Sequence, residues 1–304
     1  MPATSTWSGP PSAASPRFWP TVAWCPSACT TTSTATEGAD MVDHMPPEDL
    51  KACCASFYES DLVRRFLGDS FHPGGEDITR ALGAALELDD GSLVLDVACG
   101  AGASSIALAQ EFGCSAVGVD LSEDNLERAR GQAEEAGVDD RVQFLMMDAE
   151  ELTFEDGGFD AVVSECALCT FPDKPAALSE AIRMLRPGGR IGITDVVVER
   201  DLPERAQGIL FHVACISSAM PARGYIDALE AAGFVDVVHE DHGEAITELL
   251  DRGERLLMGW GVVEKLYGVD LEAWLGLTQE DAKEMLAGAR KWVENGDLSY
   301  GLFT

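Results

Sequence analysis

The sequence predicts an α/β fold with a doubly wound, mostly parallel sheet and helices on both faces. Short apolar segments alternate with amphipathic segments from about residue 92 to residue 239, which is the pattern of strands joined by crossover helices. The first of these strands runs into a glycine-containing turn, and later strands end in acidic residues. Hydrophobic residues make up 46% of the 304-residue chain, which is enough for a large core.

Each element follows from its local period of apolar residues. Helices are expected over residues 47–67, 76–87, 103–112, 123–136, 174–186 and 222–232. Strands are expected over residues 92–97, 115–120, 141–147, 159–164, 189–197 and 234–239. The chain after residue 243 reads as mostly helical, and Thr278 with Asp281 forms a capping pattern for its last helix.

The chain is expected to divide into four parts. Residues 1–44 read as a disordered tail or a mis-assigned start, because Ser, Thr, Pro and Ala dominate them and no helical or strand period runs through them. A helical cap and lid loop over 45–75 precedes the α/β domain of 76–240, and a helical extension follows over 241–304.

The charge of the chain excludes several classes of partner. Acidic residues outnumber basic ones 53 to 21, and the net charge of −32 disfavours binding to nucleic acid or to an anionic membrane. Abundant carboxylates with few lysines are typical of proteins from a high-salt cytoplasm. The sequence shows no signal peptide and no apolar run of membrane-spanning length, which indicates a cytoplasmic protein. Its nine cysteines are then reduced and free to act as ligands or nucleophiles.

The most informative motif is the strand that carries Asp96 and continues into a turn with Gly100 and Gly102. Glycines allow a backbone to approach a ligand closely, and the N–H groups of the following helix offer donors. Asp120 ends the next strand, where a carboxylate can accept hydrogen bonds from both hydroxyls of a ribose. Asp148 follows the third strand and is placed to hydrogen-bond an adenine amine. This ordered series predicts a nucleoside site.

With these residues in this order, the chain over roughly 75–240 resembles the class I S-adenosylmethionine-dependent methyltransferases. The resemblance implies a Rossmann-like seven-stranded sheet, S-adenosyl-L-methionine (SAM) as cofactor and methyl transfer as the reaction. Ala98 stands where an NAD site usually has its first glycine, which favours a sulfonium nucleoside over a dinucleotide. The cofactor-binding residues implied in this chain are Asp96, Gly100, Gly102, Asp120, Leu121, Asp148, Ala149 and Glu165.

Cysteines from three separate segments are candidates for the acceptor site. Cys166 follows the fourth expected strand, Cys215 lies between the fifth and sixth, and Cys53 and Cys54 lie on the helix expected to cover the site. Ligands of an open parallel sheet bind beyond the carboxyl ends of its strands. Thiolates suit a soft acceptor such as arsenic or selenium, but a free cysteine is also often a small buried hydrophobe.

The run from Glu165-Cys166 to Pro172-Asp-Lys174, with the Cys215 segment, resembles arsenite methyltransferases. That family binds trivalent arsenic with three thiolates, and a cellular thiol is then a possible reductant. Two features depart from the family pattern, because Glu165 replaces an asparagine and Cys169 is an additional thiol. The arsenic ligands and catalytic residues that the resemblance implies are Cys166, Cys215 and either Cys54 or Cys53.

Two other functions stay open at this point. The enzyme could methylate a small organic metabolite, quinone-like or a thiol, with the cysteines in the core. Alternatively, the fold could serve a thiol-based protein that binds or senses a metalloid. His72 could cover the cofactor, contact the substrate or order its own loop. Convergence of the thiols near the methyl group would favour the metalloid over the organic acceptor.

Overall fold

The computed structural model describes most of the chain after residue 44. The described residues are 45–60, 63, 70, 72–201, 215–268, 270–272 and 278–304. The expectations for residues 1–44, and for much of the lid loop before residue 72, lie outside them. Among these residues, no helix has both the length and the apolar character needed to cross a membrane.

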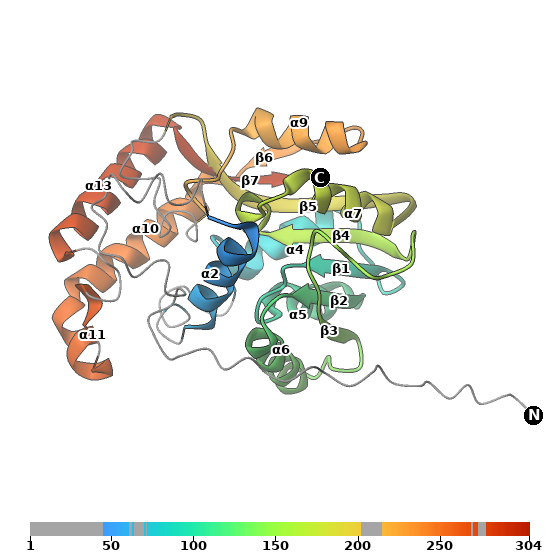
Figure 1. The fold of residues 1–304 in the computed structure, drawn as a ribbon, viewed down its shortest axis with the longest axis horizontal. Coiled ribbons are helices and arrows are strands. Elements are labelled where there is room, and N and C mark those ends of the chain that lie inside the picture. Colours follow the sequence, from blue (N-terminus) through green and yellow to red (C-terminus); the bar gives the residue numbers. More distant parts are fainter. Residues whose placement is uncertain are drawn as a thin grey trace, which may run out of the picture.

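A seven-stranded sheet forms the centre of the molecule (Figure 1), with the order β3-β2-β1-β4-β5-β7-β6. Its strands are β1 (Leu93–Val97), β2 (Ser115–Asp120), β3 (Val142–Met146), β4 (Phe159–Glu165), β5 (Leu185–Val198), β6 (His239–Asp241) and β7 (Leu298–Phe303). The first five strands pair in parallel, and β7 runs antiparallel to both β5 and β6. The predicted fold class is therefore confirmed.

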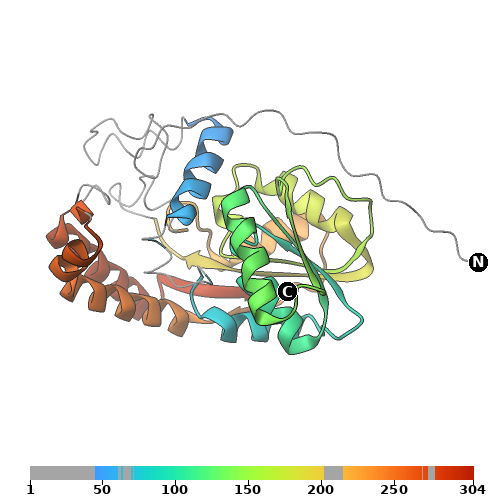
Figure 2. The ribbon, with the colours of Figure 1, turned by 90° about the horizontal axis from the view of Figure 1, so that it is seen from below.

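Helices cover both faces of the sheet (Figure 2). In chain order they are α2 (Pro47–Glu59), α4 (Gly75–Ala85), α5 (Ala103–Phe112), α6 (Glu123–Ala136), the 3-10 helix η1 (Leu168–Thr170), α7 (Lys174–Met184), α9 (Ala222–Ala232), α10 (Gly243–Met258), α11 (Trp260–Tyr267) and α13 (Gln279–Asn295). Successive strand residues point to opposite faces, so Val94 packs with α4, α5 and α6, whereas Leu95 packs with α7 and α9.

The last strand corrects the expectation of a mostly helical chain after residue 243. Residues 298–303 form β7, which pairs with β5 from Ile193 opposite Phe303 to Val198 opposite Leu298. A six-residue apolar run that contains a serine and a glycine is too short for its period to separate strand from helix. The expected strand over 234–239 is also displaced, because β6 begins only at His239.

Helices α10, α11 and α13 form a group at the side of the sheet, next to β7 (Figure 1). The expected cap of α13 is present, since the Thr278 hydroxyl accepts the Asp281 N–H and the Asp281 carboxylate accepts the Thr278 N–H. Helix α2 lies apart from this group, close to the ends of the central strands (Figure 1).

Candidate active site

One pocket opens beyond the carboxyl ends of β1, β2, β3 and β4, and α2 forms one of its walls. Most of the residues expected at the site line it together, namely Cys54, Asp96, Gly100, Asp120, Leu121, Asp148, Ala149, Glu165 and Cys166. The other expected residues, Gly102, Cys53 and Cys215, are not part of its lining. Lys51 and Tyr58 also line the pocket, and so does His72, for which the sequence left open a role at the cofactor, at the substrate or in its own loop.

The turn after β1 owes its shape to three residues with positive φ. Ala98, Gly100 and Gly102 have φ values of 59°, 53° and 81°. Residues other than glycine rarely adopt this region. A Cβ on Gly102 would lie 2.7 Å from the Phe144 ring and 2.8 Å from the Ala129 Cβ. Gly102 therefore serves the packing of α5 against β3 and α6, and its role in cofactor binding stays a prediction.

Asp120 connects this turn to the next helix. One carboxylate oxygen accepts the Gly100 N–H at 2.9 Å, and the other accepts the Ser122 N–H at 2.9 Å. Burial raises the pKa of Asp120, while these backbone N–H groups lower it. Each oxygen can accept a second hydrogen bond, so the carboxylate can still receive two hydroxyl groups from the pocket.

Asp96 lies beneath the turn. It is 1% exposed, and its carboxylate accepts the Ser105 hydroxyl at 2.6 Å. Burial raises the pKa of Asp96 to about 7, with a further contribution from the charge of Glu165. A pKa near 7 means that the protonated and ionised forms of Asp96 are both populated at neutral pH.

The Lys51 side chain connects α2 to the segment of the pocket wall that follows β3. Its Nζ lies 2.7 Å from Asp148 Oδ2 and 2.5 Å from Glu150 Oε2. The three side chains are largely shielded from solvent, which strengthens their attraction relative to a surface pair. Residues this distant in the chain give no local pattern, so sequence reasoning could not find this contact.

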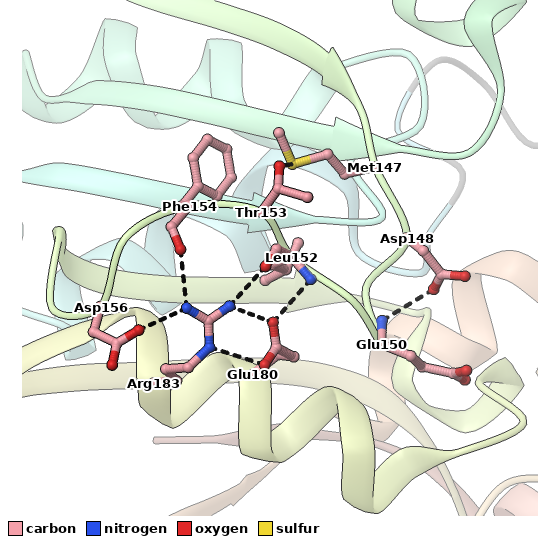
Figure 3. Close-up of polar contacts among 9 residues, drawn as sticks. All are labelled: Met147, Asp148, Glu150, Leu152, Thr153, Phe154, Asp156, Glu180 and Arg183. Carbon is pink, nitrogen blue, oxygen red and sulfur yellow. Dashed lines mark hydrogen bonds and ion pairs between the residues drawn. The ribbon is translucent and has the colours of Figure 1, made fainter.

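Arg183 on α7 fixes the loop that follows Asp148 (Figure 3). Its guanidinium donates to the Leu152 carbonyl at 2.7 Å and to the Phe154 carbonyl at 2.9 Å. It also bonds Glu180, which in turn accepts the Leu152 N–H at 2.8 Å. Two side chains of α7, Arg183 and Glu180, thus hold residues 152–154 of the loop.

Four cysteines that form no disulfide lie near one another, namely Cys54, Cys166, Cys169 and Cys215, and the first two line the pocket. The Cys215 thiol donates to the Cys166 carbonyl at 3.1 Å, and the Tyr58 hydroxyl lies 4.0 Å from the Cys215 sulfur. The sulfurs of Cys166 and Cys215 and a carboxylate oxygen of Asp195 lie within 4.8 Å of one another. Cys53 is 1% exposed and is not one of the free thiols.

The pKa values of three thiols in this cluster, on Cys54, Cys166 and Cys169, are raised, which favours their protonated forms. Burial raises the pKa of Cys54 to about 12, and the proximity of Cys215 adds to the effect. A hydrogen bond with Cys215 and then burial raise the pKa of Cys166 well above its ordinary value. Cys166 and Cys215 also have positive φ values, 54° and 61°, which are strained for residues with a side chain and are typical of functional sites.

The strand that sequence reasoning missed contributes to this end of the pocket. Tyr300 on β7 shares a 2.9 Å hydrogen bond with the Thr194 hydroxyl, which donates to Glu165 at 3.0 Å. Glu165 also accepts the Thr79 hydroxyl at 2.8 Å. The carboxylate of Glu165 is therefore held directly by α4 and β5, and β7 supports it through Thr194.

Comparison with known proteins identifies the class of the chain. Residues 88–239 match a family model described as a methyltransferase domain. Methyltransferase GfsG of Streptomyces halstedii is 30% identical over 210 residues, which cover 64% of this chain and 73% of the relative. A sarcosine/dimethylglycine N-methyltransferase of Halorhodospira halochloris is 30% identical over 237 residues, which cover 74% and 79%.

Solved structures share the fold. Phosphoethanolamine N-methyltransferase 2 of Haemonchus contortus, bound to phosphomonomethylethanolamine and S-adenosylhomocysteine, matches with a TM-score of 0.68 at 23% identity over 86% of this chain and 60% of its own. The [4+2]-cyclase SpnF matches with a TM-score of 0.65 at 22% identity over 85% and 96%. The family match over 88–239 and the two relatives at 30% identity therefore establish that the chain belongs to the S-adenosylmethionine-dependent methyltransferases.

Proposed function

We propose that this enzyme transfers the methyl group of SAM to a heteroatom of a small organic metabolite. The observation that carries the proposal is the continuity of the pocket, whose lining runs from Gly100 and Asp120 at one end to Cys54 and Cys166 at the other. The part lined by Gly100 and Asp120 suits a nucleoside, and α2 encloses the part lined by Cys54. The names of relatives support an organic acceptor, since one of them methylates sarcosine or dimethylglycine.

The pocket has the charge and shape that SAM requires. Four of its carboxyl groups, on Asp96, Asp120, Asp148 and Glu165, face one lysine, Lys51. This excess of negative charge suits a cofactor that carries a sulfonium and an ammonium. Asp120 would hold the ribose hydroxyls and Asp148 the adenine amine. Leu121 lines the pocket yet is 42% exposed, which offers an apolar surface for the adenine ring.

The residues of the pocket act by orientation and by exclusion of water. When bound, SAM supplies a methyl group on a positively charged sulfur that leaves readily. Helix α2, fastened by Lys51 at one end, closes the pocket over the reacting groups. Holding acceptor and methyl carbon in line lowers the barrier because the two no longer have to meet in solution.

Replacing Arg183 with methionine is expected to weaken SAM binding about tenfold while the fold stays intact. The substitution frees two loop carbonyls, so the loop that carries Asp148 loses its fixed position. The measurement is the dissociation constant of S-adenosylhomocysteine by calorimetry. Arg190→Met is the matched control, because Arg190 pairs with Glu87 at the surface. Equal dissociation constants for both variants would show that Arg183 does not support the site.

Arsenite is a second candidate acceptor, and a specific observation favours it. Thiols from three segments, Cys54, Cys166 and Cys215, lie near one another, in the number that trivalent arsenic accepts, and the first two line the pocket. Cys54 is the stronger candidate than Cys53 for the third ligand, since Cys54 lines the pocket. Thiols that are neutral at rest can bind arsenous acid with release of water, so protonation does not prevent this reaction.

One set of assays separates the two acceptors. S-Adenosylhomocysteine formation is measured with sarcosine, phosphoethanolamine, a small thiol, a hydroquinone and, with glutathione present, arsenite. We expect turnover with an organic acceptor that persists in Cys166→Ser and Cys215→Ser. Arsenite-dependent turnover that is lost in both variants, but kept in the core control Cys114→Ser, would establish arsenite instead.

A further inference from the structure

Three metal-ligating side chains from separate segments meet beside the pocket. The sulfurs of Cys166 and Cys215 and a carboxylate oxygen of Asp195 all lie within 4.8 Å of one another. Cys166 follows β4, Asp195 lies on β5, and Cys215 precedes α9. The Cys166 N–H donates to the Thr194 carbonyl at 2.6 Å, which places Cys166 beside Asp195. The sheet therefore brings together ligand atoms that are distant in the sequence.

The carboxylate of Asp195 is buried without a basic partner. Its exposed fraction is 0%, and within the described residues no lysine, arginine or histidine lies at ion-pair distance from it. One oxygen accepts the Cys169 N–H and the other accepts the Val196 N–H, both at 2.8 Å. Ligating carboxylates are commonly held by hydrogen bonds of this kind, and each oxygen keeps a second acceptor position. A buried carboxylate is costly unless it is paired or coordinates a metal.

The spacing of the three atoms suits a tetrahedral divalent ion. Zinc binds sulfur at about 2.3 Å and carboxylate oxygen at about 2.0–2.2 Å, so its ligand atoms stand roughly 3.6–3.8 Å apart. The three atoms need to approach one another by about 1 Å at most to reach that geometry. The two sulfurs exclude calcium and magnesium, which take oxygen ligands. Three protein ligands leave one zinc position for water or another ligand.

A metal ion can reach these side chains from the pocket. Cys166 lines the pocket and is only partly buried. Tyr58 also lines it, and the Tyr58 hydroxyl lies 4.0 Å from the Cys215 sulfur. Cys215 itself is 1% exposed, and its thiol donates to the Cys166 carbonyl at 3.1 Å. An ion that binds first at Cys166 therefore meets Cys215 as its next ligand.

We infer that Cys166, Cys215 and Asp195 form a binding site for a thiophilic divalent cation, namely zinc. The two thiol protons pass to solvent when the thiolates bind the ion. This ligand set differs from the one that trivalent arsenic would use, because it includes the Asp195 carboxylate and omits Cys54. The inference goes beyond the proposed function and is tested without cofactor or acceptor, so its failure would leave that function standing.

Cobalt(II) reports such a site directly, because it takes the place of zinc and absorbs light. We expect the reduced, metal-free chain to bind one Co²⁺ with thiolate charge-transfer absorption, and one equivalent of Zn²⁺ to remove that absorption. Cys166→Ser and Cys215→Ser should each abolish the spectrum, and Asp195→Asn should weaken Co²⁺ binding at least tenfold. Cys114→Ser is the matched control, since Cys114 is a buried free thiol elsewhere in the core. A wild type without this spectrum, or an unchanged spectrum in Cys166→Ser, overturns the inference.

X-ray absorption at the zinc edge separates this site from a site of three thiolates. In the one-to-one zinc complex we expect two sulfur ligands at about 2.3 Å and two oxygen ligands at about 2.0–2.2 Å. The same ligand set is expected in Cys54→Ser, because Cys54 is not one of the three ligands. Three or four sulfur ligands, or zinc binding that is lost in Cys54→Ser and complete in Asp195→Asn, would contradict the inference.

Discussion

Replacing Asp120 with alanine is expected to weaken the binding of S-adenosylhomocysteine at least a hundredfold, or about 2.8 kcal/mol. Two effects combine in this variant. The carboxylate that would accept the ribose hydroxyls is lost, and so are the 2.9 Å bonds that fix the Gly100 turn and the start of α6. Hydrogen bonds to a charged group each contribute about 1.5–3 kcal/mol, so a large effect follows from a single side chain.

The test of this expectation is calorimetric titration with S-adenosylhomocysteine. Asp124→Ala is the matched control, because Asp124 is an exposed carboxylate in the first turn of the same helix. Asp120→Asn keeps one oxygen acceptor and should give an intermediate loss. If Asp120→Ala binds within fivefold of the wild type and has an unchanged circular dichroism spectrum, the ribose site lies elsewhere.

The parts of the fold that could be predicted are those with a long local pattern. The helix over 222–232 and the strand over 115–120 match α9 and β2, because each shows a clear period of apolar residues. The strand β7 could not be found in this way. Its position between β5 and β6 depends on pairing with residues about a hundred positions earlier in the chain, and no local period reports such a contact.

The absence of a local pattern for long-range contacts also explains which residues of the site could be predicted and which could not. Asp120 and Asp148 could be singled out because the ends of neighbouring parallel strands meet at one edge of a sheet. The choice between Cys53 and Cys54 could not be made, since adjacent helix residues point about 100° apart and the phase of α2 depends on its packing. The pairs Lys51 with Asp148 and His72 with Glu165 join segments that only the folded chain brings together.

Asp96 has a measurable consequence for stability. Burial raises its pKa to about 7, whereas the ordinary pKa of aspartate is 3.8. Below the lower pKa both the folded and unfolded chains are protonated at this group, so it contributes nothing. As pH rises toward 7, the unfolded chain gains an ionised carboxylate that the folded chain resists, and the free energy of unfolding falls. Above the pKa of Asp96 in the folded protein, the free energy of unfolding falls no further on account of this group.

We therefore expect Asp96→Asn to remove a pH-dependent loss of stability on the order of 3 kcal/mol between pH 5 and pH 8. Asparagine has the same shape, and its amide can still pair with the Ser105 hydroxyl 2.6 Å away, so little is lost at low pH. The measurement is urea unfolding of the cofactor-free protein at both pH values, with the exposed Asp139→Asn as control. Wild-type and Asp96→Asn curves that shift in parallel with pH would mean that Asp96 is ionised in the folded protein and that its burial is compensated.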